Sequence, residues 1–204
     1  MSRNPFIERL ADQHEAQIKR TLEDLEASIV SDISKAVSKE DIITTQIAIQ
    51  LRPNIKRYIE ETYSTVADSN VRDYDRIVAS FMDEFGELNI PDNFKTLTQV
   101  DLDTITQLKF QSFSGYEEIA NRYFTEISNN VYQNAIAGKP FDEMVKDISG
   151  LITGDVDRRG RSMAGYASQI AHDSVMQFDG QFTVYQAKEA GLNKFKYTGT
   201  LVRD

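Results

Sequence analysis

Residues 5–37, PFIERLADQHEAQIKRTLEDLEASIVSDISKAV, carry the strongest fold signal in the chain, because they predict one long amphipathic helix. Apolar residues recur there at spacings of three and four, with charged residues between them, as on one face of an α-helix. This apolar stripe consists of Ile7, Leu10, Ile18, Leu22, Leu25, Ile29 and Ile33. Parts of it repeat every eleven residues, a period that keeps a stripe nearly parallel to the axis of a straight helix.

A stripe of this length has too much apolar surface for a small domain to cover. It packs along a second long helix of the same chain, or it docks on another protein. We predict that the helix binds a partner. Deletion of residues 1–38 would then leave the rest of the chain folded and abolish that binding.

The following residues predict further helices. Residues 43–66 carry a second stripe of i, i+4 spacing, and Pro53 interrupts it, so that a kink or a short break is expected near residues 51–52. A third helix is expected over 74–85, since Gly86 is a natural C-terminal stop. Residues 86–98 lack periodicity and predict a loop.

The second half of the chain continues the helical pattern. A short helix is expected over 101–110, and Ser114–Glu117 has the spacing of a capping box that opens a new helix. That helix closes at Gly138. A short amphipathic helix is expected over 141–152 and a last long helix over 161–190, packed antiparallel to the one that Ser114 opens.

Residues 194–200, KFKYTGT, alternate basic or hydroxyl residues with aromatic ones, the period-two pattern of a half-buried strand. One strand cannot stand alone, so we expect its partner strands in a longer gene product. The predicted fold class is mainly α, with long amphipathic helices in antiparallel hairpins and a short β-strand at the C-terminal end. The predicted segments are a long-helix region (1–86), a loop and short helix (87–113), a helical core (114–191) and the start of a small β unit (192–204).

Composition supports this fold class. The 204 residues include only ten Gly and four Pro, too few for the frequent turns of a many-stranded β fold. No cysteine is present, which excludes disulfides, thiolate metal ligands and cysteine nucleophiles. No apolar run approaches the ~20 residues that span a bilayer, and the N-terminus has no apolar segment of a secretory signal.

The net charge of −9 is unevenly distributed. Residues 158–204 carry seven Lys/Arg and four Asp/Glu, a balance of +3, which leaves −12 for residues 1–157. Five of these cations could grip phosphate or a carboxylate-rich partner: Arg158, Arg159, Arg161, Lys194 and Lys196. A plain solvated surface is the alternative interpretation. If DNA is the partner, the binding is expected to be weak, independent of sequence and sensitive to salt.

Motifs of catalysis are absent from the sequence. His14 and His172 are far apart, and neither has a second ligand three or four residues away, as a helical metal site requires. No glycine-rich phosphate loop and no G-x-S-x-G motif occurs. Acidic pairs such as Glu60 with Glu61 are typical of solvated helix faces. We therefore expect no enzyme activity, no cofactor and no metal.

One resemblance covers about a third of the chain. Residues 167–192, ASQIAHDSVMQFDGQFTVYQAKEAGL, precede the KFKYTGT segment, and GKPFDEM begins at Gly138. This resembles the phage head morphogenesis family, the minor head proteins related to the F protein of phage Mu, whose signature helix has an I-A-R-T-E-like start and an A-G end. The chain departs from it with His172, Asp173 and Ser174 in place of Arg-Thr-Glu, and with Tyr197 where Trp is common.

The resemblance implies a structural virion component that associates with the portal oligomer inside the capsid and assists genome packaging or ejection. It implies the portal protein and other head proteins as partners, possible weak contact with packaged DNA, and host cytoplasm as the place of assembly. With this family, the stripe of residues 7–33 becomes the expected portal-binding element. Two alternatives stay open: a cytoplasmic helical adaptor or scaffold protein, and the non-catalytic part of a longer enzyme.

Overall fold

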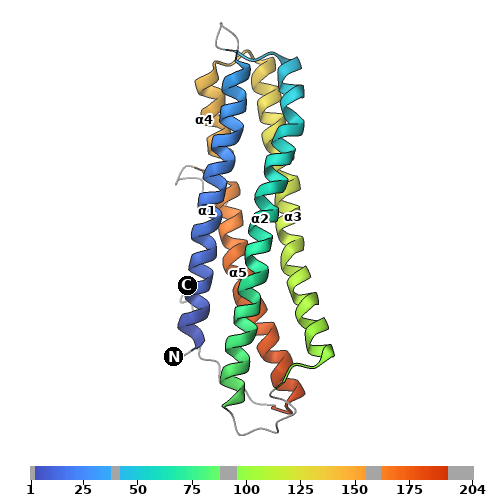
Figure 1. The fold of residues 1–204 in the computed structure, drawn as a ribbon. Helices are drawn as coiled ribbons and strands as arrows, with labels where there is room; N and C mark the ends of the chain where they lie inside the picture. The colour runs from blue at the N-terminus through green and yellow to red at the C-terminus, as the bar shows by residue number, and fades with distance from the viewer. Residues whose placement is uncertain (1–2, 38–41, 88–95, 155–161, 193–204) are drawn as a thin grey trace.

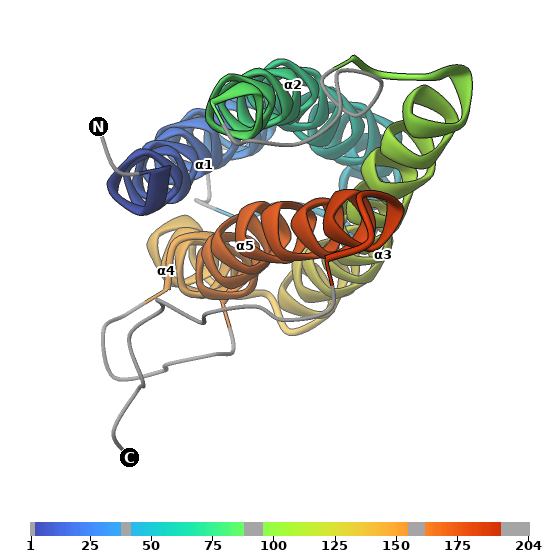
Figure 2. The same ribbon diagram turned by 90° about the horizontal axis from the view of Figure 1, so that it is seen from below.

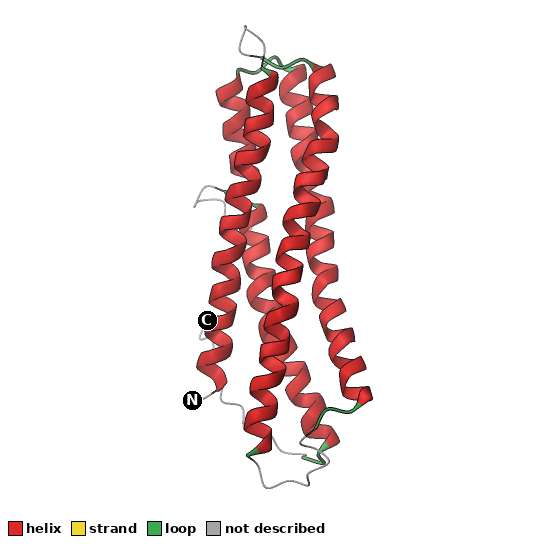
Figure 3. Cartoon of the chain, in the orientation of Figure 1, coloured by secondary structure: helices red, strands yellow, loops and turns green. Residues whose placement is uncertain are grey.

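The computed structural model describes residues 3–37, 42–87, 96–154 and 162–192. Five helices account for most of them, and no strand occurs in these ranges (Figure 3). The helices are α1 (Arg3–Ala36), α2 (Thr45–Gly86), α3 (Gln99–Ile136), α4 (Phe141–Ile152) and α5 (Met163–Glu189). The mainly α fold class is thus confirmed.

The helices form an elongated bundle of four rows. In Figure 1, α1 runs upward from the N-terminus, α2 returns downward, and α3 runs upward again. The fourth row runs downward and consists of α4 followed by α5. Seen along its axis, the bundle has α1 and α2 on one side, with α4 and α5 opposite them (Figure 2). This is the up-down-up-down arrangement of a four-helix bundle, with neighbours antiparallel. At about 1.5 Å per residue, the 42 residues of α2 span about 63 Å.

Glycines with positive φ follow the ends of α3 and α4. Gly138, two residues after α3, has φ +62°, and Gly154, two residues after α4, has φ +73°. Only glycine adopts such a left-handed conformation at little cost, so each helix stops there. A Cβ at Gly154 would lie 2.5 Å from the Ser162 side chain. The chain therefore leaves and rejoins the fourth row at nearly one point, and α5 continues the row that α4 began.

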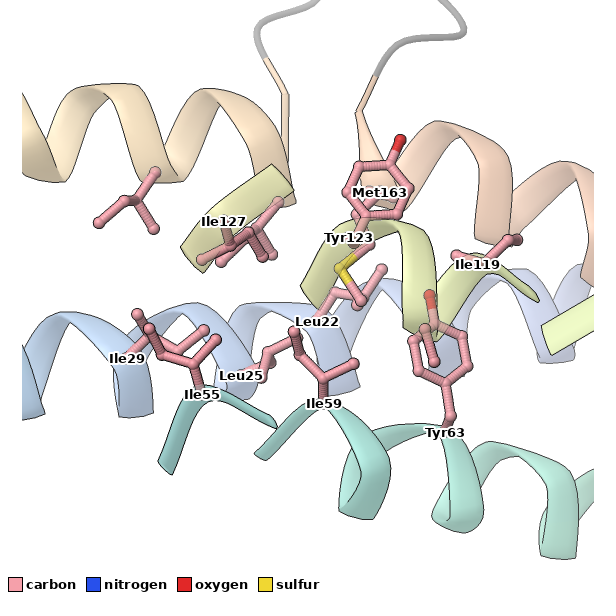
Figure 4. Packing of buried hydrophobic residues seen from close by; sticks show 14 of the residues in the cluster. Leu22, Leu25, Ile29, Ile55, Ile59, Tyr63, Ile119, Tyr123, Ile127 and Met163 are labelled. Atoms are coloured by element: carbon pink, nitrogen blue, oxygen red, sulfur yellow. The ribbon is translucent and has the colours of Figure 1, made fainter. Parts of the chain in front are cut away.

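Two clusters of buried side chains hold the bundle together. We call the larger one the upper core: it is mostly aliphatic, it includes residues of all five helices, and Figure 4 shows its side chains converging from α1, α2, α3 and the start of α5. Its members include Leu22, Leu25, Ile29, Ile55, Ile59, Tyr63, Tyr116, Tyr123, Ile127, Met144, Ile148 and Met163. The lower core lies toward the N-terminal end of α1. It consists of Ile7, Leu10, Ala11, Tyr74, Ile77, Val78, Phe81, Ile105, Val175, Phe178 and Phe182.

Neither α2 nor α3 is interrupted where the sequence predicts a helix boundary. The helix α2 continues through Pro53, which lies on its exposed side, so that water can satisfy the carbonyl that loses its hydrogen bond. The helix α3 also continues through Ser114, whose hydroxyl donates to the Gln111 carbonyl at 2.8 Å and caps nothing.

The capping box that does occur opens α3 at Thr98: its side chain accepts from the backbone N–H of Asp101, and the Asp101 carboxylate accepts from the Thr98 N–H. The predicted helices over 74–85, 101–110 and from 114 onward are therefore parts of α2 and α3. Both cores include residues from the predicted segments 1–86 and 114–191, so these segments pack as one body. The predicted strand over 194–200 lies outside the described residues.

Candidate functional site

The apolar stripe of α1 is buried inside the chain. Each of its seven residues is at most 2% exposed. Ile7 and Leu10 belong to the lower core, and the other five, from Ile18 to Ile33, belong to the upper core. The sequence left two alternatives for this stripe, packing within the chain or docking on another protein. In the structure, long helices of the same chain cover it. The stripe residues predicted to bind a partner therefore offer it no surface in this conformation.

The five basic residues predicted to contact phosphate all lie outside the described residues. Arg158, Arg159 and Arg161 fall in the segment 155–161, and Lys194 and Lys196 fall in 193–204. The described ends of the first segment, Gly154 and Ser162, place its attachment on the fourth row of the bundle, between α4 and α5. A phosphate contact by these residues stays a prediction.

A layer of buried polar side chains separates the two cores. Its first part is His14 of α1, which is 2% exposed and hydrogen-bonded through Nε2 to the Asp73 carboxylate of α2. The second oxygen of Asp73 accepts from Arg76 at 2.9 Å. The imidazole is thus held by α2, and it lies between Ala11 and Ile18, each of which belongs to a different core.

The layer continues across the bundle to α3. The buried Asn70 side chain donates to the Tyr116 hydroxyl at 2.8 Å, and Ser69 donates to Gln17 at 2.9 Å. Burial raises the pKa of Tyr116 to about 12, although hydrogen bonds with Ser174 and Asn70 oppose that shift. Because each pair joins two different helices, the layer fixes the register of α1, α2 and α3 along the bundle.

A second polar connection joins α3 to the end of α5. The buried carboxylate of Asp101 accepts from the Gln186 side chain at 2.8 Å, in addition to its capping bonds with Thr98. Burial alone would raise the pKa of Asp101, but hydrogen bonds from Thr98, Tyr185 and Gln186 together lower it below its ordinary value. The ionised form is therefore the one that these donors hold in place.

A third connection joins α1 to α4. The Glu26 carboxylate accepts hydrogen bonds from the hydroxyls of Ser149, at 2.5 Å, and Thr153, at 2.7 Å. Beside them, Asp147 accepts from Lys139 at 2.7 Å and from Asn134 at 3.2 Å, which ties α4 to the end of α3. A groove of about 450 Å³ runs along these residues, and its lining includes Lys146 and Gly150.

These polar groups suit the joining of helices better than the turnover of a substrate. The His14 imidazole is too deeply buried for a substrate to reach, and His172 is exposed, with Asp173 3.7 Å away as an ionic partner. Within the described ranges, no three His, Cys, Asp or Glu side chains are grouped so that they could hold a metal ion. Nor is any helix in those ranges long and apolar enough to cross a membrane.

Sequence reasoning missed these connections because their partners are far apart in the chain. His14 and Asp73 are 59 residues apart, Asn70 and Tyr116 are 46 apart, and Asp101 and Gln186 are 85 apart. One signal was available: His14 falls three residues after Ala11 and four before Ile18, on the apolar stripe itself. A polar residue at a stripe position predicts a buried hydrogen bond, though not its partner.

Comparison with family models, with curated proteins and with solved structures finds no match to this chain.

Proposed function

We propose that this chain is a phage minor head protein, a structural virion component that associates with the portal inside the capsid and assists packaging or ejection of the genome. The resemblance of residues 167–192 to the signature helix of that family carries the proposal. In the structure these residues form one helix, α5, apart from the last three, and Gly191 follows it with φ +70°. A long helix that ends at this glycine is what the resemblance implies, and this agreement supports the proposal.

The use of the buried polar groups also supports a structural role. His14, Asn70, Asp101 and Glu26 each bond to a side chain of a different helix, so that their hydrogen-bonding capacity stabilises the bundle. A rigid, elongated bundle presents long outer helix faces to partners. An adaptor or scaffold protein would share these properties, so the two functions are distinguished by identifying the binding partner.

The burial of α1 changes the experiment that identifies the partner. Deletion of residues 1–38 removes one row of the bundle and exposes both cores, so we expect the truncated chain to unfold. Circular dichroism would show loss of the cooperative thermal transition. The sequence alone predicted that residues 39–204 stay folded after the deletion. We now expect unfolding, because α1 supplies eight buried residues to the two cores. The deletion therefore cannot test portal binding.

Co-purification of the intact chain tests the proposal directly. The chain would be expressed together with the portal protein encoded in the same genome, and the portal oligomer would be isolated by size-exclusion chromatography. We expect the chain to elute with the oligomer, and mass spectrometry of purified virions to detect it in few copies per portal. An intact, folded chain that never elutes with the portal and is missing from virions would refute the proposal and favour the adaptor.

A triple change of Arg158, Arg159 and Arg161 to alanine is the matched variant for DNA binding. It changes no residue that the structure describes, and circular dichroism of the variant separates loss of DNA binding from loss of folding. If DNA is bound weakly through these arginines, the binding constant of the variant depends less steeply on salt. The log–log slope should fall by ~0.9 for each phosphate that the variant no longer neutralises.

A further inference from the structure

The outer face of α5 carries few charges compared with that of α1. The helix α5 lies at the edge of the bundle (Figure 2). Only four of its 27 residues are Asp, Glu, Lys or Arg, whereas α1 has twelve in 34. Between residues 176 and 184 the one charged residue, Asp179, is half-buried, and every exposed position is uncharged: Met176, Gln177, Gly180, Gln181 and Val184. Depletion of charge is typical of the centre of a protein–protein interface.

Gly180 lies at the middle of this face, on the side of α5 opposite Phe178 and Phe182; Ala187, two turns further along the same side, is buried. A Cβ built on Gly180 would meet no atom within 4 Å in the described part of the chain. Its own bundle thus gives no steric reason for a glycine, and glycine disfavours a helix interior relative to alanine. Met176 and Val184 flank it four residues away on either side and are 38% and 42% exposed. A glycine between two apolar side chains allows another helix backbone to approach closely.

The charges at the two ends of the face identify the occupant. Asp173 and Lys188, both exposed, lie seven residues before and eight residues after Gly180. If a second α5 lies antiparallel with its Gly180 at the same point, Met176 of one copy meets Val184 of the other. Asp173 of one copy then lies near Lys188 of the other, at both ends. A parallel arrangement would instead bring like charges together, which is unfavourable.

We propose that two copies of this chain associate through the outer faces of α5, antiparallel and centred on Gly180. Such a pairing is isologous, because the same patch serves on both copies and the contact closes on itself. The face is the length of a single helix, so the association is weak and its extent depends on protein concentration. This inference goes beyond the proposed function, since it concerns contact between copies of the chain and not with the portal.

Reversal of the end charges tests the proposal. Sedimentation velocity of the intact chain over a range of concentrations at low salt should show a monomer–dimer equilibrium. Asp173→Lys alone, or Lys188→Asp alone, should raise the dissociation constant about tenfold, because each places like charges together twice in the dimer. The double variant, Asp173→Lys with Lys188→Asp, should restore it. Fifteen residues separate the two positions, so contact within one chain cannot explain a rescue.

Substitution of Gly180 gives an independent readout. Gly180→Gln should abolish the dimer and leave helix content and thermal stability undiminished, since glutamine favours a helix and has open space there. The matched control is Gly150→Gln on α4, where a Cβ also meets nothing within 4 Å among the described residues; this variant should dimerise as before. A wild-type chain that stays monomeric at every concentration, or a folded double charge reversal that fails to restore the dimer, would overturn the proposal.

Discussion

The upper and lower halves of the bundle are stabilised in different ways. In the upper core, all five helices contribute, and α3 alone supplies six buried residues, from Tyr116 to Val131. In the lower core, α3 supplies one, Ile105, and the space is filled by aromatic rings of α2 and α5. Tyr74 stacks on Phe178 with ring centres 4.4 Å apart, and Phe81 meets Phe182 edge-on at 5.2 Å.

The helix α5 follows the same division. Its buried residues in the upper core are small, apart from Met163, and include Ala164, Ala167 and Ala171; in the lower core they include Phe178 and Phe182. Small residues let neighbouring helices approach, whereas large rings hold them apart. The start of α3 is held to the lower half by Ile105, by the partly buried Leu108 and by polar contacts, such as Asp101 with Gln186 and Lys109 with Asp75 at 2.5 Å. We infer that this end of α3 opens more readily than the rest of the bundle.

The largest expected effect compares two isoleucines of α3. Ile127→Ala in the upper core should lower the free energy of unfolding by ~3–5 kcal/mol, because Ile127 is fully buried in the larger core, whose packed side chains cannot collapse to fill the cavity. Ile105→Ala in the lower core should cost ~2 kcal/mol, because only one end of one helix has to adjust. Urea unfolding would measure both, with the exposed Ile136→Ala as control. Equal losses at the two positions would contradict the difference between the cores.

The polar layer between the cores gives the next largest effect. Tyr116→Phe leaves the buried amide of Asn70 without its acceptor, so the free energy of unfolding should fall by ~1–3 kcal/mol at neutral pH. Because the fold raises the pKa of Tyr116 from 10.0 to about 12, the stability due to its neutral form is complete below pH 10 and is lost as the pH rises through 12.

The direction of this pH dependence is checked by measuring the free energy of unfolding of the wild type and of Tyr116→Phe between pH 8 and pH 12. The variant should lose less stability than the wild type over that interval, whereas Tyr132→Phe, a change at a partly exposed tyrosine, should behave as the wild type does. A variant that loses as much stability as the wild type would show that ionisation of Tyr116 is not linked to folding.

The smallest effect concerns the start of α3 in the lower half. Asp101→Asn should cost ~1 kcal/mol at pH 7, since an amide replaces the ionised acceptor of the capping box. The fold lowers the pKa of Asp101 below 3.8, so its contribution is present above that pH and is lost as the pH falls through the lowered value. Hydrogen exchange should show faster opening of residues 99–110 and no change in α4.

The pH dependence of stability tests the Asp101→Asn prediction. Below pH 3.8 the wild type loses the contribution of the ionised carboxylate, so the difference in stability between wild type and Asp101→Asn should shrink. The exposed neighbour Asp103, changed to Asn, is the matched control. A difference that stays constant from pH 7 to pH 3 would mean that the charge of Asp101 does not stabilise the fold.

The sequence by itself determined where the helices lie, because the i, i+4 spacing of apolar residues and the position of glycines are local properties. It predicted α4 with the same bounds, α5 to within two residues and α1 to within two residues at either end. Gly138 was correctly identified as a stop, and it has positive φ. Composition also determined the fold class, since so few glycines and prolines cannot supply the turns of a sheet.

Only the tertiary structure decided what covers the stripe of α1, whether α2 and α3 continue, and which polar residues meet. Pro53 and Ser114 have local preferences for a break, but burial of residues on both sides of each position favours one continuous helix. The capping box predicted at Ser114 does not form, and the one that does form is at Thr98. The His14–Asp73 and Asn70–Tyr116 bonds depend on the alignment of whole helices, a property that no local spacing encodes because it arises from the fit of the two cores.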